Sequence, residues 1–167
     1  PVLMGMFKRT IDRQVDGHEL AGSLKDEENV KNLLQTLHNT MLPEDGIELS
    51  ELTGLSVQAM KDLIFDKVKA RYASQMEKLS DPERQLEFQR AVILRVVDNN
   101  WSEHIDALDQ MRQSVGLRGY AQNNPIVEYQ EESYKMYNNM IGAIEFEVTR
   151  LMMKAQIQPQ TAIRQEA

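Results

Sequence analysis

The sequence predicts an all-α protein in which a small helical subdomain accompanies one long antiparallel pair of helices. Three observations predict this class. Glycine and proline are few, 8 and 5 among 167 residues, so long stretches contain no helix breaker. Leu, Met, Gln, Glu and Lys, which favour helices, are plentiful, whereas the alternating β-branched and aromatic runs of strands are scarce. In several segments, apolar residues recur three and four positions apart, which is the period of one helix face.

The composition excludes several classes of function. The chain has no cysteine, which excludes a disulfide framework, a thiol nucleophile and a cysteine-ligated zinc. Its 19 Lys and Arg against 26 Asp and Glu argue against general nucleic-acid binding, because that binding neutralises phosphates with basic side chains. No uncharged apolar run approaches the roughly 18 residues of a membrane span, and the first residues are wrongly ordered for a secretory signal. We therefore expect a soluble intracellular protein that binds no nucleic acid.

The first predicted helix covers residues 6–16. Phe7, Ile11 and Val15 fall four apart and share one face. The helix lacks a start signal, so preceding sequence is expected. The first of two glycines, Gly17, begins a polar stretch that we interpret as a boundary.

Three further helices are predicted in residues 17–80, which we interpret as a small helical subdomain. The first covers 27–41 and ends before the turn Pro43-Glu44-Asp45-Gly46. A short helix follows around Leu52, beginning at Ser50. Ser56 is a favourable N-cap for a longer helix that reaches Leu79, because its hydroxyl can accept a hydrogen bond from a free amide of the first turn.

Two long helices are predicted after residue 80. Asp81-Pro82-Glu83 is a helix start, because proline fits the first turn and acidic residues favour the positive end of the helix dipole. Apolar residues then recur at helical spacing in two series, from Leu94 to Val115 and from Tyr134 to Ala155. The second series is a heptad seam, so the helices should pack as an antiparallel hairpin. The predicted core of this hairpin includes Trp101, Ile105, Leu108, Tyr137, Ile141 and Ile144.

The hairpin should make the molecule elongated. Its first helix spans about 35 residues and is therefore roughly 50 Å long. A compact chain of this length has a radius of gyration of about 15 Å. The hairpin must protrude or lie along something larger.

The predicted loop between the long helices, residues 117–125, is tight and has unusual contents. Gly119 can adopt the positive φ that ends a helix, and Asn124, which precedes a proline, is a good N-cap. Leu117 and Tyr120 place apolar groups where exposure should be greatest. Composition does not decide whether this is an ordinary exposed turn or a surface that contacts a partner.

The sequence contains no catalytic motif. It has neither a G-x-x-x-x-G-K-[ST] phosphate loop nor a G-x-G-x-x-G loop. Glu103, His104 and Asp109 offer metal-binding groups, but His104 and Asp109 share one helix face poorly, so ordinary surface ion pairs are favoured over a metalloenzyme. We predict no catalytic residue, no metal and no cofactor in this chain, which by itself should not be an enzyme.

The hairpin carries three specific motifs. These are Trp101-Ser102-Glu103-His104, Leu117-Arg118-Gly119-Tyr120-Ala121-Gln122, and Asn124-Pro125 followed by Glu128-Tyr129. Together they closely resemble the C-terminal part of the SecA family, the motor ATPases of bacterial preprotein translocation. The resemblance is strong over 84–155, fair over 6–18 and weaker over 20–80.

The resemblance implies a domain organisation and a site. Residues 17–80 would be the helical wing domain, and residues 1–16 with 81–155 the helical scaffold domain, followed by a polar linker at 156–167. The hairpin would be the two-helix finger, whose loop enters the cytoplasmic mouth of the SecY channel. At its tip, Tyr120 would contact the translocating chain. The neighbours that would shape the tip are Leu117, Arg118, Gly119, Ala121 and Gln122.

The resemblance also implies partners and a location. The partners would be the SecY/SecE/SecG channel, an unfolded preprotein and the other domains of SecA, whose ATPase the family's hairpin restrains. The location would be cytoplasmic, peripheral to the membrane at the translocon. ATP and Mg²⁺ would bind nucleotide-binding domains that should precede residue 1, so the chain is expected to be a fragment inactive alone. Half-covered apolar stripes also predict some self-association. The alternative is a stand-alone helical adaptor or coiled-coil module without a motor.

Overall fold

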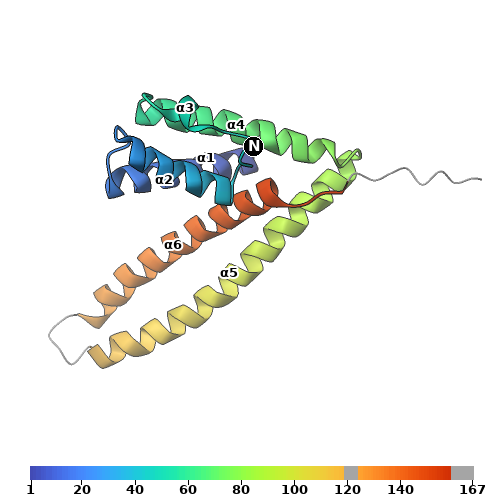
Figure 1. The fold of residues 1–167 in the computed structure, drawn as a ribbon. Coiled ribbons are helices and arrows are strands. Elements are labelled where there is room, and N and C mark those ends of the chain that lie inside the picture. The colour runs from blue at the N-terminus through green and yellow to red at the C-terminus, as the bar shows by residue number, and fades with distance from the viewer. Residues whose placement is uncertain (119–123, 159–167) are drawn as a thin grey trace, which may run out of the picture.

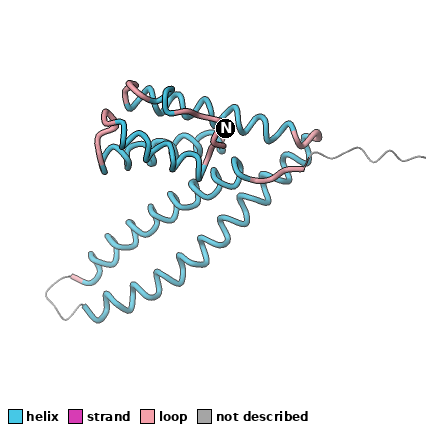
Figure 2. The backbone as a smooth tube through the Cα atoms, in the orientation of Figure 1, coloured by secondary structure: helices cyan, strands magenta, loops and turns pink. Residues whose placement is uncertain are grey.

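The computed structural model describes residues 1–118 and 124–158, and in these segments every regular element is a helix (Figures 1 and 2). The predicted all-α class is therefore confirmed. The helices are α1 (Val2–Ala21), α2 (Glu27–Thr40), α3 (Leu49–Leu52), α4 (Val57–Glu77), α5 (Pro82–Arg118) and α6 (Pro125–Lys154).

The first four helices pack with the C-terminal half of α6 around one apolar core. Figure 1 shows α1, α2 and α4 grouped on one side of the hairpin. The face of α1 predicted from Phe7, Ile11 and Val15 is buried, with at most 1% of each residue exposed. From α2, α4 and α6 the core receives Val30, Leu33, Leu37, Met60, Ile64, Val68, Val148 and Met152. Burying this apolar surface is the main term that holds the helices together.

Helix α1 is longer than its sequence signals predicted. It continues through Gly17 and ends at Ala21, so the helix end predicted at residue 16 was placed five residues too early. Glycine within a helix costs only about 1 kcal/mol relative to alanine. Contacts with other helices offset that cost: Asp16 forms an ion pair with Lys61 of α4 at 2.7 Å, and the His18 ring lies 3.1 Å from the hydroxyl of Thr36 in α2.

The local start and turn signals are confirmed by hydrogen bonds. The Ser56 hydroxyl accepts from the amide of Ala59, and the Asp81 carboxylate accepts from the amide of Glu83. The amide of Gly46 donates to the carbonyl of Pro43 at 2.9 Å, which closes the predicted turn. The short helix near Leu52 begins one residue earlier than expected, at Leu49.

Glu48 and Glu51 form a capping box at the start of α3, and the environment of the Glu51 carboxylate predicts a pH-dependent stability. Lys67 of α4 lies 2.8 Å from the Glu51 carboxylate, and this hydrogen bond, with that to the Glu48 amide, lowers the pKa of Glu51 below 4.5. A lowered carboxylate pKa stabilises the fold above the unfolded-state value, and this stabilisation disappears as pH falls through the folded-state value. Glu51→Gln should therefore destabilise the chain at pH 6 and have progressively less effect below pH 4.5.

Urea unfolding between pH 3 and 6 measures this difference. In a Lys67→Met background, Glu51→Gln should lose most of its pH-dependent effect. An effect of E51Q that is the same at pH 3 and pH 6 would contradict the assignment.

Helices α5 and α6 form an antiparallel hairpin that extends away from the rest of the molecule (Figure 1). α5 has 37 residues and α6 has 30. At 1.5 Å per residue, α5 is roughly 55 Å long. The predicted elongated shape, with one long two-helix hairpin, is confirmed.

Candidate functional site

The free end of the hairpin is defined by two helix ends. α5 continues to Arg118. Leu117 and Arg118, which were predicted to belong to the loop, therefore lie in the last turn of this helix. α6 begins as predicted, because the Asn124 side chain accepts from the amide of Ile126 at 3.1 Å and proline occupies the first helical position. Four predicted tip residues lie outside the described residues: Gly119, Tyr120, Ala121 and Gln122.

Large apolar side chains are exposed on both helices next to this end. Leu117 is 78% exposed, Ile126 is 69% exposed and Val127 is 47% exposed. A hollow of about 300 Å³ separates the helix ends, with Val115 and Tyr129 in its lining. Exposed apolar groups that cluster in this way are typical of surfaces that contact another molecule.

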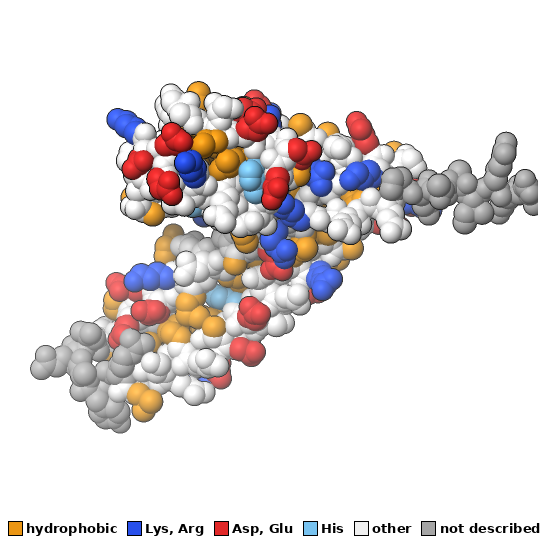
Figure 3. All heavy atoms as spheres, in the orientation of Figure 1, with side chains coloured by type: hydrophobic (Ala, Val, Ile, Leu, Met, Phe, Trp, Pro, Cys, Tyr) orange, Lys and Arg blue, Asp and Glu red, His pale blue; other side chains and the backbone are white. Residues whose placement is uncertain are grey.

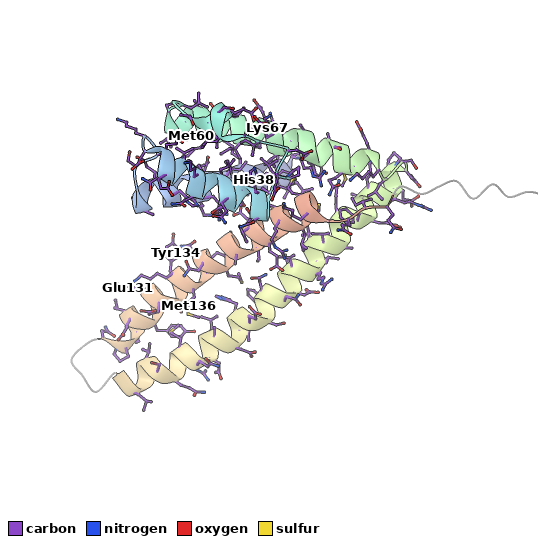
Figure 4. The ribbon with its side chains drawn as sticks, in the orientation of Figure 1. His38, Met60, Lys67, Glu131, Tyr134 and Met136 are labelled. Atoms are coloured by element: carbon purple, nitrogen blue, oxygen red, sulfur yellow. The ribbon has the colours of Figure 1, made fainter. Side chains whose placement is uncertain are left out.

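Acidic side chains accompany the apolar ones along the outer half of the hairpin. Figure 3 shows hydrophobic side chains gathered on the hairpin with acidic side chains between them. On α6, Glu131 and the 70% exposed Tyr134 lie on the side away from α5, whereas Met136 lies toward α5 (Figure 4). On α5, Asp109 is paired with Arg112 at 3.1 Å. The surface therefore offers aromatic and aliphatic area within a negative environment.

The predicted hairpin core is only partly correct. Ile144 is buried, and Leu108 and Ile141 are half-buried. The other three predicted core residues are about half exposed: Trp101 at 50%, Ile105 at 46% and Tyr137 at 48%. The prediction for these three was wrong in this structure.

The error has a simple geometric cause. α5 faces α6 with Val96, His104, Met111 and Val115, which are at most 8% exposed. Met111 and Val115 belong to the predicted apolar series, whereas the buried His104 precedes the predicted Ile105 by one position, about 100° around the helix. At the base, the Gln85 amide donates to carbonyls at the end of α4, which fixes the rotation of α5 about its axis.

The base of the hairpin is joined to α1 by a buried carboxylate. Glu145 of α6 is only 4% exposed, and it accepts from Arg9 at 2.6 Å and lies 3.5 Å from Arg13. One turn later, the buried hydroxyl of Thr149 lies 3.4 Å from that of Thr10. A buried charge is tolerated only with such partners.

The end of α6 is capped by side chains of α4. The Gln75 amide, fully buried, donates to the carbonyl of Ala155 at 2.7 Å and lies within 3.4 Å of the carbonyls of Met152 and Met153. Arg71 also donates to the carbonyl of Met153, at 3.1 Å. These carbonyls belong to the last turn, which has no partner within its own helix.

The end of α2 is capped in turn by α6. The Lys154 ammonium donates to the carbonyls of His38 and Leu42, the latter at 3.0 Å. Burial lowers the pKa of Lys154, and the nearby Arg71 lowers it further, whereas Glu44 raises it. Side chains of α4 thus cap the end of α6, and Lys154 of α6 caps the end of α2. These contacts fix the base of the hairpin to α2 and α4 as well as to α1.

The sequence analysis did not identify Glu145, Gln75 or Lys154. Glu145 had a detectable signal, because it is a charged residue between the apolar Ile144 and Val148 of a helical stripe. Gln75 and Lys154 have no such signal, since their partners are backbone carbonyls more than 75 residues away.

Within residues 1–118 and 124–158, no three His, Asp or Glu side chains come together as metal ligands. In the same segments no helix is both long enough and apolar enough to cross a bilayer.

A comparison with protein families matches this chain to a family model. The family model described as the SecA Wing and Scaffold domain matches residues 1–156, which include all six helices.

Proposed function

The chain belongs to the SecA wing and scaffold family and is part of the SecA translocation motor, and on this premise we propose that α5 and α6 are its two-helix finger. The tip of this finger contacts the preprotein at the cytoplasmic mouth of the SecY/SecE/SecG channel. The observation that carries the proposal is the exposed apolar end of the hairpin, where Leu117 and Ile126 flank the loop with Tyr120.

The chemistry of this end suits an unfolded chain of any sequence. A tyrosine ring presents a large apolar face and one polar group at low cost in side-chain entropy. The flanking aliphatic side chains extend the apolar area. Contacts of this kind do not depend on a particular partner sequence, as a motor with many substrates requires.

The motor's chemistry is assigned to other parts of the protein. The chain contains no phosphate-binding loop motif, so ATP and Mg²⁺ bind in the nucleotide-binding domains of SecA. Residues 17–80 are the wing, and residues 1–16 with 81–155 are the scaffold. The base of the hairpin, which is fixed to α1, α2 and α4, transmits movements of the motor to the tip. The protein acts from the cytoplasmic side, at the membrane surface.

A photocrosslinking experiment tests the tip contact. A photoreactive residue at position 120 of the full-length motor should crosslink to a preprotein stalled in the channel and to SecY. The reason is that position 120 lies, along the sequence, in the segment that joins the end of α5 to the start of α6, next to the exposed Leu117 and Ile126. Mass spectrometry of the products identifies both partners.

The matched control is the same residue at Leu55, an exposed wing position. The yield of crosslinks to the preprotein from position 55 should be at least tenfold lower than from position 120. A tenfold ratio of contact populations corresponds to a free-energy difference of about 1.4 kcal/mol. Crosslinks to the preprotein from position 55 without crosslinks from position 120 would contradict the proposal. They would show that the wing, and not the tip of the hairpin, contacts the substrate.

Self-association of the 167-residue chain follows from the same exposed apolar surface. Sedimentation velocity should show a concentration-dependent increase in mass for the wild-type chain. The double variant Leu117→Ser and Ile126→Ser should remain monomeric at the same concentration, because it removes the two most exposed apolar side chains among the described residues next to the loop. A monomeric wild-type chain at high concentration would contradict this prediction.

A further inference from the structure

The chain contains two Asp-Gly pairs, and the structure places them in different surroundings. Asp16-Gly17 lies inside α1, whereas Asp45-Gly46 lies in the turn between α2 and α3. The pair is chemically reactive, because glycine has no side chain to shield its amide nitrogen from the carboxyl group of the preceding aspartate. The two pairs have the same local chemistry, so their surroundings decide which of them reacts.

Both reacting groups of the helical pair are held in place. Amides inside an α-helix donate to the carbonyl four residues earlier, and α1 continues beyond Gly17 to Ala21. The Asp16 carboxylate forms the ion pair with Lys61 of α4 at 2.7 Å. The Gly17 nitrogen can therefore approach the Asp16 carboxyl carbon only after local unfolding of α1 and loss of this ion pair.

The pair in the turn is held by a single bond. Asp45 is exposed, and its side chain forms no hydrogen bond or ion pair with the part of the chain that the structure describes. The Gly46 amide donates to the carbonyl of Pro43 at 2.9 Å. Opening this one bond frees the nitrogen without unfolding a helix, and exposed turns are among the segments that open at the lowest free energy.

We propose that Asp45 is the site at which this chain forms isoaspartate, which makes the turn a substrate for an isoaspartyl carboxyl methyltransferase. The Gly46 nitrogen attacks the carbon of the protonated Asp45 carboxyl group and forms a C–N bond. The carboxyl hydroxyl and the amide proton leave together as water. Water then opens the cyclic succinimide at either carbonyl: one opening restores aspartate, and the other leaves the main chain running through the side-chain carbons, with a free α-carboxylate that the enzyme methylates.

The turn cannot absorb this change, because both of its ends are anchored. Isoaspartate adds one methylene group to the main chain, whereas Leu42 and Ile47 on either side are each 1% exposed. The Ile47 carbonyl accepts from the ring of His38 at the end of α2, at 2.9 Å (Figure 4). The Leu42 carbonyl accepts from Lys154 at 3.0 Å. Isomerisation therefore disturbs the contacts that join α2 to the end of α6.

Ageing the folded chain in neutral buffer at 37 °C tests the proposal. Peptide mapping with electron-transfer fragmentation quantifies isoaspartate at each position, and methyl transfer from S-adenosylmethionine by an isoaspartyl methyltransferase gives an independent measure. The fraction at position 45 should exceed that at position 16 by at least about tenfold, because reaction at position 16 requires local unfolding of α1. In urea, where the surroundings are lost, the two fractions should become similar.

Two substitutions at the same position are the controls. Asp45→Glu keeps the charge but has a longer side chain that closes the corresponding ring much more slowly, so methyl acceptance in this peptide should be lost. Asp45→Asn should increase it, because a side-chain amide releases ammonia more readily than a carboxyl group releases water.

Amide hydrogen exchange measures the effect on the fold. After ageing, residues 38–47 should lose protection in the wild-type chain and keep it in D45E. Equal isoaspartate fractions at positions 16 and 45 of the folded chain, or no methyl acceptance at position 45, would overturn the proposal. Unchanged exchange in chains that carry isoaspartate would overturn the predicted effect on α2. Each of these results is independent of what the tip of the hairpin contacts.

Discussion

Replacing Glu145 by lysine should lower the free energy of unfolding of the chain by about 3 kcal/mol. The substitution places a cation at a site that is 4% exposed, beside Arg9 and Arg13, which are the partners of the native carboxylate. Breaking a buried ion pair usually costs 3–5 kcal/mol, and the lower end of that range applies because both arginines are about half exposed. Urea-induced unfolding followed by circular dichroism measures the change.

The matched control is Glu131→Lys on the same helix. Glu131 is exposed and lies on the side of α6 away from α5 (Figure 4). Surface substitutions of this kind usually change stability by less than about 0.5 kcal/mol. Equal effects of E145K and E131K would show that the change in net charge, and not the buried contact with α1, determines the result.

Replacing Gln75 by leucine should cost about 2–3 kcal/mol and loosen the end of α6. Leucine has a similar volume but cannot donate, so the carbonyl of Ala155 loses its partner and those of Met152 and Met153 lose theirs in part. Each unsatisfied buried carbonyl costs about 1–3 kcal/mol, and the Arg71 bond to Met153 retains part of the cap. Amide exchange in residues 150–155 should rise together with the loss of stability.

Gln58→Leu on the same helix is the control for this variant. The Gln58 side chain is exposed and bonds only Asp62, one turn away, among the described residues. Its loss should change stability by less than about 0.5 kcal/mol and leave exchange in α6 unchanged. Normal protection of residues 150–155 in Q75L would mean that Arg71 alone is a sufficient cap.

The helix ends were predictable because their signals are local. A hydroxyl or amide side chain at an N-cap satisfies amides two or three residues away, so Ser56 and Asn124 determine their helix starts wherever the helices pack. The same reasoning failed at Gly17, where the low helix propensity of glycine is outweighed by contacts of Asp16 and His18 with other helices. Such contacts have no local signature.

The hairpin core was predicted less well for a related reason. Periodicity identifies the most apolar stripe of a helix, but burial depends on which stripe the neighbouring helix covers. On α5 the apolar stripe contains Trp101 and Ile105, yet the face toward α6 contains His104. The motifs at the tip allowed the family to be inferred from sequence, and the family match over residues 1–156 agrees with it.

The sequence by itself determined the all-α class, the order of the helices, their capped starts and the family to which the chain belongs. Each of these depends on residues close together along the chain or on motifs read directly from it. Only the tertiary structure decided which face of α5 is buried and how Glu145, Gln75 and Lys154 fix the base of the hairpin. The physical reason is that partners up to 139 residues apart meet only after the helices pack, and packing sets the rotation of each helix about its own axis.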